Sequence, residues 1–195
     1  MKISKFFSCP VFIFKLDLNH KKIQKKCLHV RDSRPPDTSR SNVGGYRSDQ
    51  INPDDPVFST LIRNINTNLK EVSLNHMGFT RETKMSSIWF CINKHRDFNK
   101  EHIHPFSILS GVYYVKVPKN SGRLLFVNDN GVDRFLPNEY IREYTPENSS
   151  EWYLEPEENT MYIFPSWMKH YAEPNLSQKE RIAISFNSNF EYTPD

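Results

Sequence analysis

The 195-residue sequence predicts a mainly β protein of the α+β class, with helices in its first part and strands in its second. From Ser86 onward, short apolar runs alternate with turn residues, which is typical of a sandwich or barrel. Before that point, two segments have apolar residues at helical spacing. A chain of this length can bury one substantial core. We therefore expect one domain, 1–195, with an N-terminal support region at 1–85 and a β core at 86–195.

The N-terminal support region is expected to supply one outer strand and two helices. Residues 11–16 are a β-rich run, and residues 19–30 carry four lysines among apolar positions, which predicts an amphipathic helix with a solvated face. Further along, Asp55 is a good N-cap with Pro56 at the first helical position, and apolar residues then recur through Leu69. We expect this second helix to cover one face of a sheet.

Two polar segments fit neither helix nor strand. Residues 41–48 contain the adjacent Gly44 and Gly45, which permit either a tight turn or a close backbone approach that lines a site. Residues 128–150 form a long polar stretch, longer than a compact domain usually carries without a purpose. A substrate lid and a merely variable loop both fit this stretch.

Composition excludes several classes of protein. Lys and Arg number 26 against 23 Asp and Glu, so the net charge of +3 gives no strong nucleic-acid signal. Three cysteines, Cys9, Cys27 and Cys91, show no C-x-x-C spacing, which argues against a disulfide framework and against a thiolate zinc site. Lys15 and Asp17 interrupt the first apolar stretch before a signal peptide or membrane span can form. We expect reduced thiols and a cytoplasmic protein.

Histidines supply the chemistry. Side chains two apart in an extended backbone share a face, so His102 and His104 form a pair of candidate metal ligands. His170 is the best third candidate, because it follows the compact apolar run 161–165, which resembles a buried strand ending at a turn. Arg181 opens another strand-like run, and a cation lies beside the metal if these strands are neighbours.

Four motifs between residues 102 and 187 carry a resemblance to a known family: H-x-H-P-x-S-x-L-S-G-V-Y-Y-V, S-G-x-L-x-F, F-P-S-W-x-x-H and E-R-I-x-I-S-F-N. They resemble an uncharacterised family of 2-oxoglutarate/Fe(II)-dependent oxygenases of bacteria and bacteriophages, itself similar to the prolyl hydroxylases. The resemblance, with the strand pattern, implies a double-stranded β-helix (jelly roll) with the helices outside. It also implies that O2 and 2-oxoglutarate are consumed, succinate is formed and an unknown substrate is hydroxylated.

The same resemblance suggests ligands for Fe(II). His102 and His170 match the two histidines of the related oxygenases, whereas His104 stands where the prolyl hydroxylases have an aspartate in H-x-D. We favour His104 as the third ligand. A site with two protein ligands, and a site completed by Asp97, remain alternatives, as does a structural zinc site.

Cosubstrate residues follow from the resemblance as well. Arg181 fits the position that binds the distal carboxylate of 2-oxoglutarate, for which a planar guanidinium offers two parallel hydrogen bonds. Tyr114 is expected to donate to the same carboxylate. Related enzymes often carry serine where this chain has Ala183, so one expected hydrogen bond is missing. Four further residues are pocket candidates: Ser110, Asn99, Trp167 and Asn187.

Two rival functions remain open at this point. One is a non-catalytic metal-binding jelly-roll module, since a fold does not dictate a function. The other is a cupin-like dioxygenase that does not use 2-oxoglutarate, which accounts for three histidines but leaves Arg181 without a role. The substrate is either a small molecule or a protein side chain, no membrane partner is expected, and a homodimer is compatible with the sequence. The resemblance suggests the cytoplasm of a bacterium or of a phage-infected host.

Overall fold

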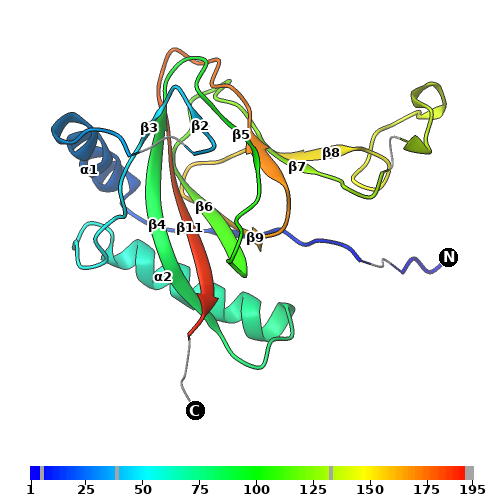
Figure 1. Cartoon of the computed structure of the whole chain (residues 1–195), viewed down its shortest axis with the longest axis horizontal. Helices are drawn as coiled ribbons and strands as arrows, with labels where there is room; N and C mark the ends of the chain where they lie inside the picture. Colours follow the sequence, from blue (N-terminus) through cyan, green and yellow to red (C-terminus); the bar gives the residue numbers. More distant parts are fainter. Residues whose placement is uncertain (5–6, 38–39, 132–133, 192–195) are drawn as a thin grey trace.

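The computed structural model describes residues 1–4, 7–37, 40–131 and 134–191, and it contains two antiparallel sheets (Figure 1). The large sheet has the order β1 (Phe12–Lys15), β9 (Thr160–Pro165), β6 (Leu109–Lys116), β11 (Arg181–Phe190), β4 (Thr83–Asn93) and β3 (Tyr46–Arg47). The small sheet has the order β2 (Asn42–Val43), β5 (Phe98–His102), β10 (His170–Ala172), β7 (Leu124–Val127) and β8 (Glu151–Leu154). The mainly β jelly roll predicted from the sequence is confirmed.

Alternation along the strands gives the large sheet two different faces. On β6, Leu109, Tyr113 and Val115 belong to the larger hydrophobic cluster, which also contains the buried residues of both helices. Val112 and Tyr114 belong to a smaller cluster, together with Leu124 and Phe126 of the small sheet. Successive strand residues point to opposite faces, so one strand serves both clusters. The space between the sheets is therefore lined by every second residue of β6.

Two helices pack outside the large sheet, as predicted (Figure 1). Helix α1 (His20–Ser33) begins after Asn19, whose side chain accepts a hydrogen bond from the backbone N–H of Lys22 at 3.1 Å. Ile23 and Cys27 of α1 are buried in the larger cluster. The helix thus buries the apolar face that its spacing predicted.

The second helix begins later than predicted. Helix α2 (Ser59–Glu71) starts four residues after Asp55, and a π-helical turn (Val72–His76) extends it. The Asp55 carboxylate instead accepts from the N–H of Val57 at 2.9 Å and pairs with Lys26 at 2.7 Å. Asp55 therefore closes a turn ahead of the helix and links it to α1, so the predicted cap position is wrong.

A tight turn at Gly44 and Gly45 joins β2 to β3, which is one of the two possibilities that the adjacent glycines left open. Gly44 has φ +81°, and a Cβ at this position would lie 2.1 Å from the Asp97 carboxylate. This turn places β2 beside β5 in the small sheet and β3 beside β4 in the large sheet. It therefore connects the two sheets next to the strand that carries His102.

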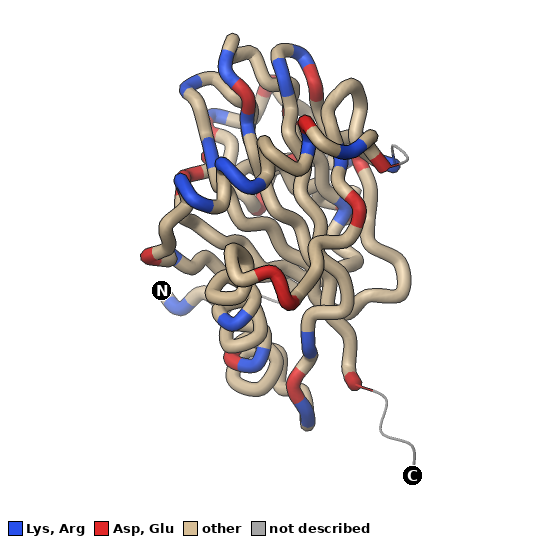
Figure 2. The backbone as a smooth tube through the Cα atoms, turned by 90° about the vertical axis from the view of Figure 1, so that its left-hand side faces the viewer, with Lys and Arg blue, Asp and Glu red and all other residues tan. Residues whose placement is uncertain are grey.

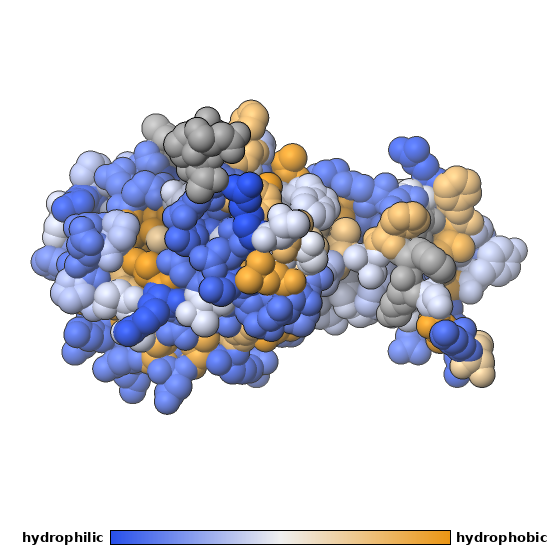
Figure 3. Space-filling view, turned by 90° about the horizontal axis from the view of Figure 1, so that it is seen from below, coloured by the Kyte–Doolittle hydropathy of each residue, from blue (hydrophilic) through white to orange (hydrophobic). Residues whose placement is uncertain are grey.

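The polar segment 128–150 projects from the end of the β7–β8 pair (Figure 1). Val127 and Glu151 are register partners, and the N–H of Asn128 donates to the Ser150 carbonyl at 2.7 Å, so the base of the segment is closed. A short 3-10 helix (Asn138–Tyr140) lies within it, and residues 132–133 lie outside the described residues. Apolar side chains, among them Phe135 and Leu136, are exposed on it (Figure 3).

The surface agrees with the mild net charge. Lys and Arg are interspersed with Asp and Glu over the described part of the chain (Figure 2). Among the described helices, none is long and apolar enough to span a bilayer.

Candidate metal centre

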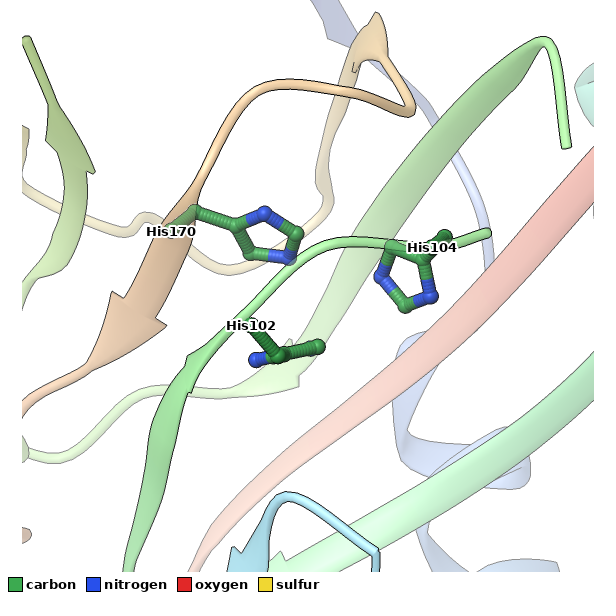
Figure 4. A group of neighbouring side chains, drawn as sticks. All are labelled: His102, His104 and His170. Atoms are coloured by element: carbon green, nitrogen blue, oxygen red, sulfur yellow. The ribbon is translucent and has the colours of Figure 1, made fainter. Parts of the chain in front are cut away.

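Three histidines from two strands and one turn converge between the sheets (Figure 4). His102 ends β5 and His170 begins β10, and the two are register partners in the small sheet. His104 lies two residues beyond the end of β5, directly before a turn. One nitrogen from each ring lies within 4.8 Å of the others, and the ring centroids of His102 and His170 are 4.4 Å apart. The structure thus brings together the three histidines that the sequence singled out.

Backbone carbonyls orient two of these rings. Nδ1 of His102 is 2.7 Å from the Lys100 carbonyl, and Nδ1 of His170 is 2.8 Å from the Met168 carbonyl. A hydrogen bond at one ring nitrogen fixes the tautomer and leaves the other nitrogen to a metal. Both histidines therefore present Nε2 to the centre.

The third position is held by a turn rather than by a strand. The N–H of His104 donates to the Ser166 carbonyl at 3.0 Å, which fixes the turn against the segment before β10. Among the described residues, no carboxylate joins the histidine group. Asp97, the alternative ligand, accepts from the backbone N–H of Lys94 at 2.7 Å and shapes its own turn.

Burial keeps the three imidazoles neutral. Desolvation lowers the pKa of His102, and desolvation together with the other two histidines lowers the pKa of His104 to about 3. Desolvation and then His102 lower the pKa of His170 to about 4. Neutral imidazoles have a free lone pair, so at neutral pH the group is ready to bind a metal.

An unpaired buried cation lies at the inner end of the adjoining cavity. Arg181 is only 2% exposed, and its Nη1 donates to the carbonyls of Ser121 at 2.5 Å and Glu173 at 3.1 Å. Its Nη2 is 3.5 Å from Oδ1 of Asn93, its register partner on β4. No carboxylate of the described residues forms an ion pair with it, and burial lowers the pKa of its guanidinium.

Tyr114 lines the same inner cavity. It is 2% exposed on β6, opposite Ala183 of β11, and burial raises the pKa of its phenol to about 12. The hydroxyl therefore stays protonated and able to donate. The inner cavity has a volume of about 70 Å³ and is also lined by the three histidines, Arg181 and Leu124.

A larger outer cavity, of about 440 Å³, adjoins the inner one. The residues that border both cavities include two of the histidines and lie in β4, in β5, directly before β2 or shortly after β5: Ser41, Trp89, Cys91, Asn99, His102 and His104. The Arg47 guanidinium lies 4.9 Å from the centroid of the Trp89 ring, and that ring lies 6.1 Å from the ring of His104. Arg40 and Lys100 add two exposed cations to the wall.

The pocket candidates occupy different places. Asn99 lines both cavities, and Asn187 lines the outer one. Ser110 is buried beneath them, where its hydroxyl donates to Oδ1 of Asn187 at 2.9 Å and lies 2.7 Å from the Ser166 hydroxyl. Trp167 is 57% exposed on a turn and lines neither cavity. Ser110 thus supports Asn187 rather than the cavity directly.

Sequence reasoning missed three residues of the site: Asn93, Trp89 and Arg47. Trp89 and Asn93 lie on β4, each two residues from Cys91. Because side chains alternate along a strand, all three point to the same, inner face. Which face is inward becomes clear only from the pairing of β4 with β11. Arg47 follows the glycine turn and belongs to the segment 41–48, for which the sequence left a role in lining a site open, but nothing in its sequence neighbourhood indicates that it lies over an aromatic ring.

Similarity to solved structures supports the fold. A prolyl-4-hydroxylase of Pseudomonas putida aligns over 93% of each chain with a TM-score of 0.65 and 14% identity. A viral collagen prolyl hydroxylase of Paramecium bursaria Chlorella virus-1, solved with 2-oxoglutarate, aligns over 91% of this chain and 94% of its own (TM-score 0.60, 10% identity). HygX of Streptomyces hygroscopicus, solved with nickel and 2-oxoglutarate, covers 91% and 82% (TM-score 0.61, 8% identity).

Sequence comparison identifies the family. No curated protein matches the chain at a significant level. The family model described as "Putative 2OG-Fe(II) oxygenase" matches residues 87–187, which is more than half of the chain and contains the three histidines, Tyr114 and Arg181. The fold, the histidine group and this match lead to one conclusion: the chain belongs to the family of 2-oxoglutarate/Fe(II)-dependent oxygenases.

Proposed function

We propose that this chain hydroxylates its substrate with Fe(II) held by His102, His104 and His170, and that Arg181 and Tyr114 bind the distal carboxylate of 2-oxoglutarate. The observation that carries the proposal is the buried Arg181 guanidinium without a carboxylate partner among the described residues. A buried charge is costly unless it is paired. An anionic ligand supplies the missing partner at this position.

The donor set fits the metal. Three neutral imidazoles on one side of the centre suit a divalent transition metal and leave the cavity side open to exchangeable ligands. When bound, iron and 2-oxoglutarate supply the activation of O2. With His104 in the place of a carboxylate, the centre carries one more unit of positive charge than a site with two histidines and one carboxylate.

The protein itself orients the cosubstrate and excludes water. Tyr114 and Arg181 approach the inner cavity from neighbouring strands of the large sheet, and His102 and His170 approach it from the small sheet. When Tyr114 and Arg181 hold the distal carboxylate of 2-oxoglutarate, the rest of the cosubstrate is directed toward the histidines. Apolar lining from Leu124 and Phe164 keeps this inner space largely dry.

The outer cavity is the place for the substrate. It opens beside His102 and His104, and its wall includes hydrogen-bond donors such as Asn187, Gln50 and Lys100. Oδ1 of Asn187 and Oε1 of Gln50 already accept protein hydrogen bonds, so their amide N–H groups are the parts available to a ligand. This wall favours a substrate with hydrogen-bond acceptors.

A titration of 2-oxoglutarate into anaerobic, Fe(II)-loaded protein tests the proposal. In Arg181→Ala the affinity should fall by about thirtyfold to several thousandfold, since breaking a buried, hydrogen-bonded charge pair costs roughly 2–5 kcal/mol. Arg181→Lys should recover only part of the loss, because an ammonium cannot form the bidentate contact. Iron binding should persist in both variants.

Arg63→Ala is the matched control, because this arginine is exposed on α2 and far along the chain from the site. Its affinity for 2-oxoglutarate should equal that of the wild type. If Arg181→Ala also binds 2-oxoglutarate normally, the cosubstrate assignment is wrong, and the cupin-like or non-catalytic function becomes the better explanation of the three histidines.

A further inference from the structure

Phe106 combines two unfavourable features, two residues after the third histidine. Its side chain is 98% exposed, although burial of an aromatic side chain removes a large apolar area from water. Its φ is +64°, and Pro105 before it makes this the third position of a turn, where glycine or asparagine is usual. A bulky residue in this backbone region is strained, and such strain is concentrated at functional sites. Neither feature stabilises the fold, which points to a role in binding.

Three further apolar residues are exposed around this turn. Ile103 is 44% exposed, Trp167 is 57% exposed, and Pro105 is exposed as well. The backbone of residues 104–108 is hydrogen-bonded to that of Ser166, the residue before Trp167, so the two segments lie side by side. We call this set the apolar rim: Ile103, Pro105, Phe106 and Trp167.

The apolar rim borders the outer cavity. Ile103 and Pro105, on either side of His104, line that cavity, whereas Phe106 and Trp167 do not. A ligand that enters the cavity and also covers the whole rim must therefore extend beyond the cavity volume of about 440 Å³. Exposed apolar side chains gathered beside a polar cavity are typical of an interaction surface.

Another part of the same cavity wall is basic. Arg40 and Lys100 line the cavity, and neither forms an ion pair with a described residue. The N–H of Lys100 donates to the Ser41 carbonyl at 2.8 Å, so the two cations lie on neighbouring segments. Among the described residues that line the cavity, only Glu101 is acidic, and its carboxylate is 3.8 Å from Nζ of Lys169. This part of the wall should therefore attract an acidic group.

We propose that the apolar rim binds a polypeptide substrate, which presents an apolar side chain to the rim and an acidic side chain to Arg40 and Lys100. This inference rests on the proposed function and names the substrate class of the same site. A polypeptide fits because one chain carries both kinds of side chain and extends beyond the cavity. Its backbone carbonyls also match the amide donors of the outer cavity.

Three peptide pools, bound anaerobically to the Fe(II)-loaded protein with 2-oxoglutarate and followed by fluorescence anisotropy, test the inference. The peptides are about ten residues long, which spans roughly 33 Å when extended. All pools have a randomised centre. The first pool has phenylalanine on one side of the centre and aspartate on the other, in both chain orders. Lysine replaces the aspartate in the second pool, and serine replaces the phenylalanine in the third. The first pool should bind at least about tenfold more tightly than either of the others.

Phe106→Asn should separate binding from folding. Asparagine adopts a positive φ more readily than phenylalanine, so the melting temperature of the free protein should rise or stay unchanged. The Kd of the first pool should rise about ten- to one-hundredfold, as expected when burial of an aromatic side chain is lost. The Kd values for Fe(II) and 2-oxoglutarate should equal those of the wild type, since Phe106 lines neither cavity.

Phe135→Asn is the matched control. Phe135 is also exposed, at 79%, but it belongs to the segment 128–150 and lines neither cavity, so its variant should bind the first pool normally. Trp167→Ser is a second variant of the rim and should weaken binding in the same direction as Phe106→Asn. Lys100→Glu should reduce the preference for aspartate over lysine, because it reverses one charge of the basic wall.

Three results would overturn the inference. The first is that the aspartate and phenylalanine pool binds no more tightly than the other two, which would favour a small-molecule substrate. The second is a normal Kd of that pool in both Phe106→Asn and Trp167→Ser. The third is a lower melting temperature of Phe106→Asn with weaker Fe(II) binding, which is the behaviour of a structural residue.

Failure of this inference is distinguishable from failure of the proposed function. If only the inference is wrong, Arg181→Ala still weakens the binding of 2-oxoglutarate. If Arg181→Ala binds 2-oxoglutarate normally, the proposed function is wrong, and the apolar rim is then no part of a hydroxylation site.

Discussion

The two faces of the large sheet differ in what their residues do. On β11, Ile182, Ile184 and Phe186 point toward the helices and are fully buried in the larger hydrophobic cluster. The alternate residues Arg181 and Ala183 point to the small sheet and line the inner cavity. One strand thus provides the core with its even-numbered residues and the site with its odd-numbered ones.

Strand β4 repeats this division. Ile88 and Phe90 lie in the core beneath the helices, whereas Trp89, Cys91 and Asn93 line the cavity. Because the side-chain period of a strand is two, stability and binding are separated by one residue rather than by a domain boundary. Substitutions at adjacent positions should therefore have unlike effects, and the following predictions test this division.

Removal of a histidine ligand on the small sheet should cause the largest loss of Fe(II) binding. His102→Ala and His170→Ala should each abolish Fe(II) binding, because each removes one imidazole of the group and no other described histidine, cysteine or carboxylate lies within reach. The unfolding transition should remain cooperative. Metal analysis of the purified variants, with His29→Ala on α1 as control, checks this. Wild-type metal content in both variants would place the metal elsewhere.

Truncation on the helix-facing side should affect stability and leave binding intact. Phe186→Ala should lower the free energy of unfolding by about 3–5 kcal/mol, because it leaves a cavity in the core. Urea denaturation of the metal-free protein measures this loss. The folded variant should bind 2-oxoglutarate with an affinity within about threefold of the wild type, roughly 0.7 kcal/mol. If the folded variant binds 2-oxoglutarate much more weakly than the wild type, the two faces of the sheet are coupled.

The third histidine allows a finer test on the cavity side. His104→Ala should weaken Fe(II) binding at least about tenfold, the lower range found even for residues that only support metal ligands. His104→Asp should keep the metal, because a carboxylate at this position completes the usual set of two histidines and one carboxylate. Calorimetric titration with Fe(II) under anaerobic conditions compares the variants. Full affinity in His104→Ala would favour a site with two protein ligands.

The segment 128–150 should matter least to metal and cosubstrate binding. None of its described residues lines the inner or the outer cavity, and its base is closed by the pairing of Val127 with Glu151. Replacement by an Asn-Gly turn should leave the melting temperature within a few degrees and both affinities unchanged. If the segment is a substrate lid, its replacement should change the turnover rate of the substrate, once that substrate is identified. Lower affinity for 2-oxoglutarate would instead show a direct role.

Much of the fold could be predicted from the sequence. The long strands β4, β6, β9 and β11 carry apolar runs that are strong local signals, and both helices show apolar residues at helical spacing. The short strands β5, β8 and β10 were not predicted, because few of their residues are buried and their pairing partners determine them.

The site was predicted in part. Spacing marked His102 and His104, the apolar run before it marked His170, and the strand-like run after it marked Arg181, whereas Tyr114 came from the family resemblance. Trp167 is a pocket candidate because it stands beside the motifs, but its side chain lies on an exposed turn. Asn93 has ordinary sequence surroundings, and only its contact with Arg181 identifies it.

The pairing of β5 with β10 has a consequence for how the protein is made. His102 and His170 are register partners, yet 170 − 102 = 68 residues separate them along the chain. Contacts of such sequence separation form late, because the entropy of loop closure must be overcome before they stabilise anything. During synthesis the ribosome releases His102 and His104 well before His170, so the early chain can offer a metal only two imidazoles. The three-histidine site is therefore complete only once β5 and β10 have paired, so metal affinity should report how completely these two strands are assembled.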